Sequence, residues 1–256
     1  MTDMQATYPS LKGKTAVISG GATGIGEGFV RAFAAQGTTV TFLDINVAAG
    51  NALADEINAI GQAKALFLTC DVTDIQAVQE AIQRSAIAQG PASILVNNAA
   101  NDKREEFNDI TEDDFTWMMN VNLRHHFFAA QAIVPQMRQV GGGSVINLSS
   151  PTWINGGPDM PNYSMAKAAI IGLSNCIAKR FGADRIRSNA ILPGSVFTER
   201  QLTKWYDKED IAKAIAHQAI PEQILPRHVA DLALFLAADE SRTISKQMFH
   251  INGGSA

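Results

Sequence analysis

Short β-rich runs alternate along this 256-residue chain with longer stretches in which apolar residues recur at every third or fourth position. Strands separated by helices are joined by crossover connections, and such connections make neighbouring strands parallel. Most of the short runs are apolar almost throughout, as expected for strands buried on both faces. The alternation therefore predicts a single α/β domain over residues 1–256, with a doubly wound, seven-stranded, mostly parallel sheet between two layers of helices. The expected strands span 15–20, 39–44, 65–72, 93–99, 144–150, 186–194 and 247–253.

Charge and composition limit the kinds of partner that such a chain can take. The net charge of -4 comes from mixed signs without a basic block, which argues against nucleic acid and anionic membrane surfaces. The sequence has no secretion-signal pattern and no window of about eighteen apolar residues, so we expect a cytoplasmic protein acting on small molecules. Cys70 and Cys176 have no metal-site spacing, and we expect both thiols to be reduced and buried.

The stretch "ISGGATGIG", residues 18–26, joins the first expected strand to the first helix, where doubly wound folds hold phosphate. Glycine permits positive φ and lets backbone N–H groups and a helix N-terminus approach a pyrophosphate. The spacing Gly20-x-x-x-Gly24-x-Gly26 differs from G-x-G-x-x-G, and no Lys-Ser/Thr follows as in a P-loop. The turn predicts a dinucleotide site, with an ordinary structural turn as the alternative.

Asp44 ends the second expected strand about twenty residues after the glycine turn, where a carboxylate accepts hydrogen bonds from an adenosine ribose. The same charge repels a 2′-phosphate. No Arg or Lys lies between Gly20 and Gly28 or beside Asp44, so we expect NAD rather than NADP. The alternative is an Asp that only caps the next helix.

Tyr163 and Lys167 stand four residues apart in a helical pattern and therefore share one helix face. An ammonium about 4 Å from a phenol contributes roughly 4 kcal/mol at an effective dielectric near 20, which lowers the tyrosine pKa by nearly three units. Ser150 closes the fifth expected strand at the same edge as the glycine turn, where its hydroxyl can share a substrate oxygen with the phenol. The alternatives are a structural helix pair with a snorkelling lysine, and a serine that caps a loop.

Taken in order, "SGGATGIG", "NNAA", "NVNL", Ser150, "YSMAK" and "PGSVFT" resemble the short-chain dehydrogenase/reductase family over nearly the whole chain. The resemblance implies a Rossmann fold, with Tyr163 as general acid/base and Lys167 lowering its pKa and binding the nicotinamide ribose. It further implies that Ser150 orients the substrate and that Asn122 maintains a proton relay. The cofactor contacts expected from the turn and the resemblance together are Gly20, Thr23, Gly24, Ile25, Gly26, Asp44, Asp71, Val72, Asn98, Ala99, Tyr163, Lys167, Pro193, Val196 and Thr198.

Two residues depart from the family pattern. Ala100 stands where the family has glycine, and its Cβ disfavours a positive φ beside the nicotinamide. Pro151 directly follows Ser150, fixes φ and removes a donor, so we expect the substrate loop to leave the strand at an unusual angle.

A narrower resemblance, in "YPSLKGK", "NDKR", "NVNLRHHFF" and "TERQLTKWY", is to bacterial aldose 1-dehydrogenases that oxidise xylose, arabinose, galactose or fucose to lactones. The resemblance implies a homotetramer. Independently of it, the long irregular segment at about 195–210 is expected to be an ordered substrate loop or lid. Two of the expected substrate contacts have structural alternatives. Arg104 can instead pair with Glu105 or Glu106 at the surface, and Trp205 can instead anchor the lid. The expected substrate contacts are Arg104, Ser150, Trp153, Asn155, Tyr163, Gln201 and Trp205.

The sequence as a whole predicts an NAD-dependent oxidoreductase that oxidises a free aldose at C1. One alternative is chemistry on another carbonyl or alcohol, such as a keto sugar acid, a ketoacyl thioester or an alicyclic ketone. A second alternative is a cofactor-sensing protein without turnover, which the intact set of Ser150, Tyr163 and Lys167 disfavours. We expect no metal, because His125 and His126 have no carboxylate or cysteine at ligand spacing.

Overall fold

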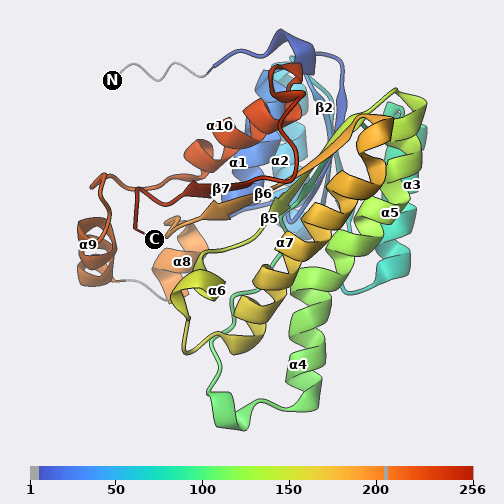
Figure 1. The fold of residues 1–256 in the computed structure, drawn as a ribbon. Coiled ribbons are helices and arrows are strands. Elements are labelled where there is room, and N and C mark those ends of the chain that lie inside the picture. Colours follow the sequence, from blue (N-terminus) through green and yellow to red (C-terminus); the bar gives the residue numbers. More distant parts are fainter. Residues whose placement is uncertain (1–5, 205–206, 256) are drawn as a thin grey trace.

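The computed structural model describes residues 6–204 and 207–255 and contains one seven-stranded sheet (Figure 1). Its spatial order is β3-β2-β1-β4-β5-β6-β7, and every pairing is parallel, so the predicted doubly wound sheet is confirmed. The strands are β1 Thr15–Ser19, β2 Thr39–Asp44, β3 Ala65–Thr69, β4 Ile94–Asn97, β5 Gly143–Leu148, β6 Ile186–Pro193 and β7 Met248–Ile251. Several end before the predicted boundary, and the residues beyond them form the loops of the candidate site.

Helices connect the strands and also occupy the segment that was predicted to be irregular. They are α1 Gly24–Ala35, α2 Val47–Ile60, α3 Ile75–Gln89, α4 Glu112–Met119, α5 His125–Gln139, α6 Thr152–Asn155, α7 Pro161–Phe181, α8 Glu199–Lys204, α9 Lys208–Ala216 and α10 Pro226–Ala237. The expectation of an irregular loop over about 195–210 is wrong, because α8 and the start of α9 lie there. Asp207 explains where α9 begins, since its side chain accepts hydrogen bonds from the N–H groups of Glu209 and Asp210.

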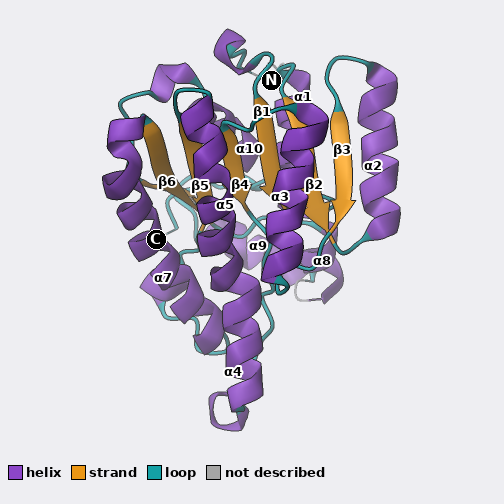
Figure 2. Ribbon diagram, turned by 90° about the vertical axis from the view of Figure 1, so that its right-hand side faces the viewer, coloured by secondary structure: helices purple, strands orange, loops and turns teal. Residues whose placement is uncertain are grey.

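The helices form two layers, with α1, α2 and α10 on one face of the sheet and α3, α5 and α7 on the other (Figures 1 and 2). Successive residues of a strand point to opposite faces. In β1, Ala16 and Ile18 pack in the core under α1 and α10, whereas Val17 packs in the core under α3 and α5. Both faces of the sheet are therefore covered, which accounts for the nearly continuous apolarity of its strands.

Because all strands run in one direction, their carboxyl ends meet at a single edge. Figure 2 shows α4 and α8 beyond the arrowheads of the strands, so these segments lie over that edge. The strand order reverses between β1 and β4, and ligands of doubly wound folds bind beside such a reversal. The topology thus places the candidate site where β1, β4, β5 and β6 end.

The two cysteines differ in exposure. Cys70 is buried, and burial together with the charges of Asp71 and Asp74 raises the pKa of its thiol to about 11. Cys176 is exposed on α7, so the expectation of a second buried thiol is wrong. Its helix buries the neighbouring Ile177, and the rotation of about 100° per residue places Cys176 outside the buried face. No helix within the described residues is long and apolar enough to cross a membrane.

Candidate active site

The glycine turn after β1 is shaped for close backbone approach. Gly20 and Gly24 have φ of +66° and +61°, conformations that L-residues rarely adopt. A Cβ on Gly26 would lie 1.7 Å from the carbonyl oxygen of Gly20, so α1 packs against the turn more closely than any side chain allows. Within the described chain, the side chain of Thr23 caps none of the first N–H groups of α1. This helix N-terminus is therefore a suitable cradle for a pyrophosphate.

Asn98 and Asp44 hold the glycine turn from the ends of β4 and β2, the two strands that flank β1. The Asn98 side-chain amide donates to the carbonyl oxygens of Ser19 and Gly20 at 3.1 and 2.9 Å. Asp44 accepts from the N–H of Ala22 with one carboxylate oxygen and from the N–H of Asn46 with the other, both at 3.0 Å. Asp44 is not the cap of α2, because Asn46 is. Each Asp44 oxygen retains acceptor capacity, so the carboxylate fits a ribose diol.

The other expected cofactor contacts follow the carboxyl ends of β3, β4 and β6. Thr198 lies directly over the glycine turn, since its Cγ2 would be 3.2 Å from a Cβ on Gly24. The Asp71 carboxylate accepts from the backbone and hydroxyl of Thr73 and is held within its own turn. Ile25 packs against the core of α1. The residues placed along this edge are Asp71, Val72, Ala99, Pro193, Val196 and Thr198.

Tyr163, Ser150 and Lys167 come together at this edge, as predicted. The Ser150 side chain forms a hydrogen bond with the Tyr163 hydroxyl. Lys167 is buried below the tyrosine, with its Nζ 5.4 Å from the centre of the phenol ring and donating to the carbonyl oxygen of Leu148 at 2.7 Å. Ser149 ties helix α7 to the end of β5, because its hydroxyl donates to the carbonyl oxygen of Lys167 at 2.7 Å. This arrangement can accept or supply a proton at the phenol oxygen.

The electrostatics of this group differ from the sequence-based expectation. Burial raises the pKa of Tyr163 above its ordinary value, the charge of Asp102 raises it further, and the Ser150 hydrogen bond and Arg200 act the other way. Burial also lowers the pKa of Lys167 to about 7. The expected lowering of the Tyr163 pKa is therefore wrong. The reason is that the ammonium faces a backbone carbonyl and desolvation outweighs the favourable contacts of the phenolate.

Asn122 lies in a π-helical turn, Asn120–Arg124, between α4 and α5. It is buried, and its side-chain oxygen accepts from the N–H of Asn101 at 2.9 Å while its amide donates to the carbonyl oxygen of Met118 at 3.0 Å. Asn122 thus fixes the start of the loop that follows β4. Its predicted relay role remains a prediction.

The lid contacts that loop through Asp102 and Arg200, which were not predicted as site residues, and through Gln201, which was. Arg200 donates to one carboxylate oxygen of Asp102 at 2.9 Å, and Gln201 donates to the other at 2.6 Å. Arg200 also reaches the side-chain oxygen of Asn101 at 3.3 Å. The signal was present in "NDKR" at the end of a strand and in "TERQ" of the lid, but nothing in the sequence pairs these segments.

The expected substrate residues are only partly brought together. Gln201 lies at the Asp102 contact, and α6 carries Trp153 and Asn155 just after Ser150. Arg104 forms an ion pair with Asp159 at 2.9 Å, and both side chains are more than a third exposed. Trp205 lies outside the described residues.

The two departures from the family pattern are accommodated. In the described chain, the residues other than glycine with positive φ are Arg185 and Lys246, so Ala100 carries no such strain. Pro151 has φ of -70°, its preferred value, and begins the short helix α6. The backbone at both residues is unstrained, and the exit angle of the substrate loop remains a prediction.

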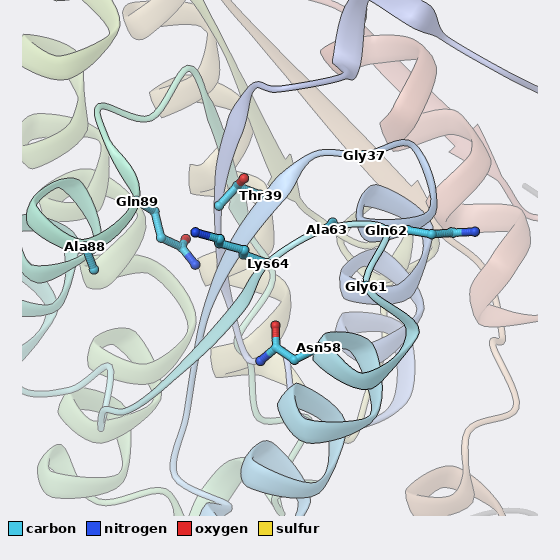
Figure 3. Close-up of a pocket in the computed structure, with 9 residues that line it drawn as sticks. All are labelled: Gly37, Thr39, Asn58, Gly61, Gln62, Ala63, Lys64, Ala88 and Gln89. Carbon is cyan, nitrogen blue, oxygen red and sulfur yellow. The ribbon is translucent and has the colours of Figure 1, made fainter.

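A separate cavity of about 630 Å³ lies at the opposite edge of the sheet (Figure 3). Its polar side chains serve the fold, because Asn58 exchanges two hydrogen bonds with the backbone of Ala65 and Gln89 accepts from Thr41. It is far from the chemistry of Tyr163. The lining residues are Gly37, Thr39, Asn58, Gly61, Gln62, Ala63, Lys64, Ala88 and Gln89.

His125 and His126 are fully buried beside each other, with ring centres 4.4 Å apart. Burial and the charge of Lys167 lower the pKa of His125 to about 3, which keeps its imidazole neutral. No group of three or more His, Cys, Asp or Glu within the described residues is arranged to hold a metal ion.

A nicotinamide-binding oxidoreductase is the class of protein that this fold and site define. Residues 20–256 match the family described as enoyl-(acyl carrier protein) reductase, and the chain belongs to the short-chain dehydrogenase/reductase family of NAD(P)-dependent enzymes.

The chain is similar to proteins named for sugar oxidation. It is 39% identical to "Probable galactose dehydrogenase GalD" of Rhizobium meliloti, over 99% of both chains. It is 40% identical to D-xylose 1-dehydrogenase of Caulobacter vibrioides, over 97% of this chain and 98% of that one. Among solved structures, it resembles a metagenomic blue fluorescent protein in complex with NADPH, with a TM-score of 0.88, 29% identity and coverage of 96% and 99%.

Proposed function

We propose that this protein is an NAD-dependent dehydrogenase that oxidises a free aldose at C1 to the aldonolactone, with Tyr163 as general base. The observation that carries the proposal is the similarity to galactose and xylose dehydrogenases over nearly the whole chain. The site supports it, because Tyr163 and Ser150 lie under a lid with hydrogen-bonding side chains. Such side chains suit a substrate that carries several hydroxyl groups.

In this mechanism Ser150 and Tyr163 hold the C1 hydroxyl between them, and the phenolate of Tyr163 accepts its proton. Bound NAD supplies the hydride acceptor. Lys167 lies within the same buried cluster, and its pKa of about 7 lets it exchange a proton near neutral pH. Arg200 and Gln201 of α8 contact the loop after β4, and Thr198 packs over the glycine turn, so we expect these segments to shield the reacting atoms from water.

The direct test compares D-galactose and D-xylose with their 1-O-methyl glycosides, following NADH absorbance with the purified protein. A glycoside keeps every other hydroxyl but has no C1 hydroxyl to oxidise. We expect NADH from at least one free aldose and none from its glycoside. Equal NADH production from both would overturn oxidation at C1 and favour a secondary alcohol as the reacting group.

The same assay separates the alternatives. Similarity at 33% identity to a protein named 3-oxoacyl-[acyl-carrier-protein] reductase keeps reduction of a ketoacyl thioester as the second candidate. Oxidation of NADH by ketoacyl thioesters or keto sugar acids, together with silence on aldoses, would support reduction of another carbonyl. Tight cofactor binding without turnover on any of these compounds would indicate a sensor.

The proposed preference for NAD over NADP is supported by Asp44, whose carboxylate lies beside the glycine turn. We expect kcat/KM with NAD to exceed that with NADP by at least about tenfold, roughly 1.4 kcal/mol. Asp44→Ala should narrow this gap, because it removes both a ribose acceptor and a charge that repels a 2′-phosphate. Steady-state kinetics with NAD and with NADP measure the ratio of the two kcat/KM values.

Asp55→Ala is the control, since this exposed carboxylate lies on the following helix α2 and should leave the ratio unchanged. Equal efficiencies with the two cofactors in the unmodified enzyme would show that Asp44 only fixes the backbone of the turn.

We also propose a cytoplasmic homotetramer. Phe115, Trp117 and Phe127 support self-association, because these large apolar side chains on α4 and α5 are 41 to 50% exposed. Light scattering coupled to size exclusion measures the mass in solution, and a monomer at micromolar concentration would contradict the proposal.

A further inference from the structure

We propose that Asp102 determines the sugar specificity of this site, because its lid-held carboxylate accepts hydrogen bonds from two neighbouring ring hydroxyls of the aldose. This inference rests on the proposed oxidation of an aldose and names the residue that reads its stereochemistry.

The first support is the way in which the loop is fixed. Asn122, in the buried π-helical turn, holds the N–H of Asn101 at 2.9 Å, immediately before Asp102. The Asp102 side chain is only 21% exposed, so its position is set by the fold rather than by solvent. A carboxylate placed in this way is prepared for a ligand of one geometry.

The second support is the acceptor capacity of the carboxylate. Arg200 occupies one oxygen and Gln201 the other, at 2.9 and 2.6 Å. An ionised carboxylate has about four acceptor positions, so about two remain, one on each oxygen. Two adjacent hydroxyls of a sugar ring supply two donors at the spacing of two carboxylate oxygens.

The third support is proximity to the reacting group. The charges of Asp102 and Arg200 both act on Tyr163, which places this ion pair in the neighbourhood of the phenol. A sugar with its C1 hydroxyl at Tyr163 then has ring hydroxyls within reach of Asp102.

The test is Asp102→Asn, which keeps the shape of the side chain and removes its charge and half of its acceptor capacity. The measurement is kcat/KM for the better of D-galactose and D-xylose and for its 2-, 3- and 4-deoxy analogues. We expect the unmodified enzyme to lose about tenfold or more at two adjacent positions, because a buried acceptor is left without its donor. In Asp102→Asn we expect those two losses to shrink to about threefold or less.

A residue that only latches the lid would behave differently. Asp102→Asn would then lower kcat/KM for the sugar and for all its deoxy analogues by one common factor, and this unchanged pattern would overturn the inference. Asp184→Asn is the matched control, because it breaks another Asp–Arg pair, with Arg138 at 2.8 Å, at the opposite edge of the sheet. It should keep the discrimination of the unmodified enzyme.

The activity of the unmodified enzyme on aldoses distinguishes failure of the Asp102 inference from failure of the proposed function. Activity on an aldose with an unchanged pattern in Asp102→Asn overturns the role of Asp102 alone. Silence of the unmodified enzyme on every aldose overturns the proposed function, and the role of Asp102 with it.

Discussion

Tyr163→Phe is expected to lower kcat for oxidation by a factor of about 10² to 10⁴, the usual contribution of a positioned acid/base group. The substitution removes one oxygen atom and keeps the ring that packs 5.4 Å from the Lys167 ammonium. The site should therefore keep its shape, and NAD should bind with little change in Kd. Steady-state kinetics give kcat, and fluorescence titration gives the Kd.

The pH profile identifies the base independently. Oxidation needs the phenolate, so kcat/KM of the unmodified enzyme should rise with pH, and the raised pKa of Tyr163 places this rise on the alkaline side. The Tyr163→Phe variant should lack this rise of kcat/KM with pH. Tyr8→Phe is the matched control, because it removes the same oxygen from a ring that packs on Phe235, away from the site. Normal turnover by Tyr163→Phe would refute the mechanism.

Gly26→Ala is expected to destabilise the fold by more than about 3 kcal/mol, at the upper end of the cost of overpacking. The new Cβ would lie 1.7 Å from the Gly20 carbonyl oxygen and 2.8 Å from the Asn98 amide nitrogen. Relief requires α1 to move away from the turn, which also widens the proposed pyrophosphate cradle. Urea denaturation measures the free energy of unfolding, and any folded protein should bind NAD more weakly.

Gly172→Ala is the matched control in α7. A Cβ there meets no atom within 4 Å, so the same change should stabilise the helix by about 0.5 to 1 kcal/mol. If Gly26→Ala were as stable as the unmodified protein, the close approach of α1 to Gly20 would not exist in solution.

Local patterns accounted for much of the architecture. Each strand was predictable because its apolar run indicates burial on both faces. The glycine turn and Ser150 follow strand ends at one edge of the sheet, and helical spacing joins Tyr163 to Lys167. Asp44 was predictable for the same reason, since it ends β2 beside the turn. The exposure of Cys176 was not predicted, because the helical pattern around it does not say which side faces solvent. The helix of the lid was not predicted, because its short segment fits a loop as well as a helix.

The sequence by itself determined the sheet, the glycine turn and the grouping of Ser150, Tyr163 and Lys167, because these depend on periodicity and on which strand ends meet at one edge. The tertiary structure alone decided what surrounds that group. Asp102 and Arg200 are 98 residues apart and meet only because the lid folds over the end of β4. The direction of the Tyr163 pKa was likewise decided by burial, a property of the packed molecule that sequence spacing does not contain.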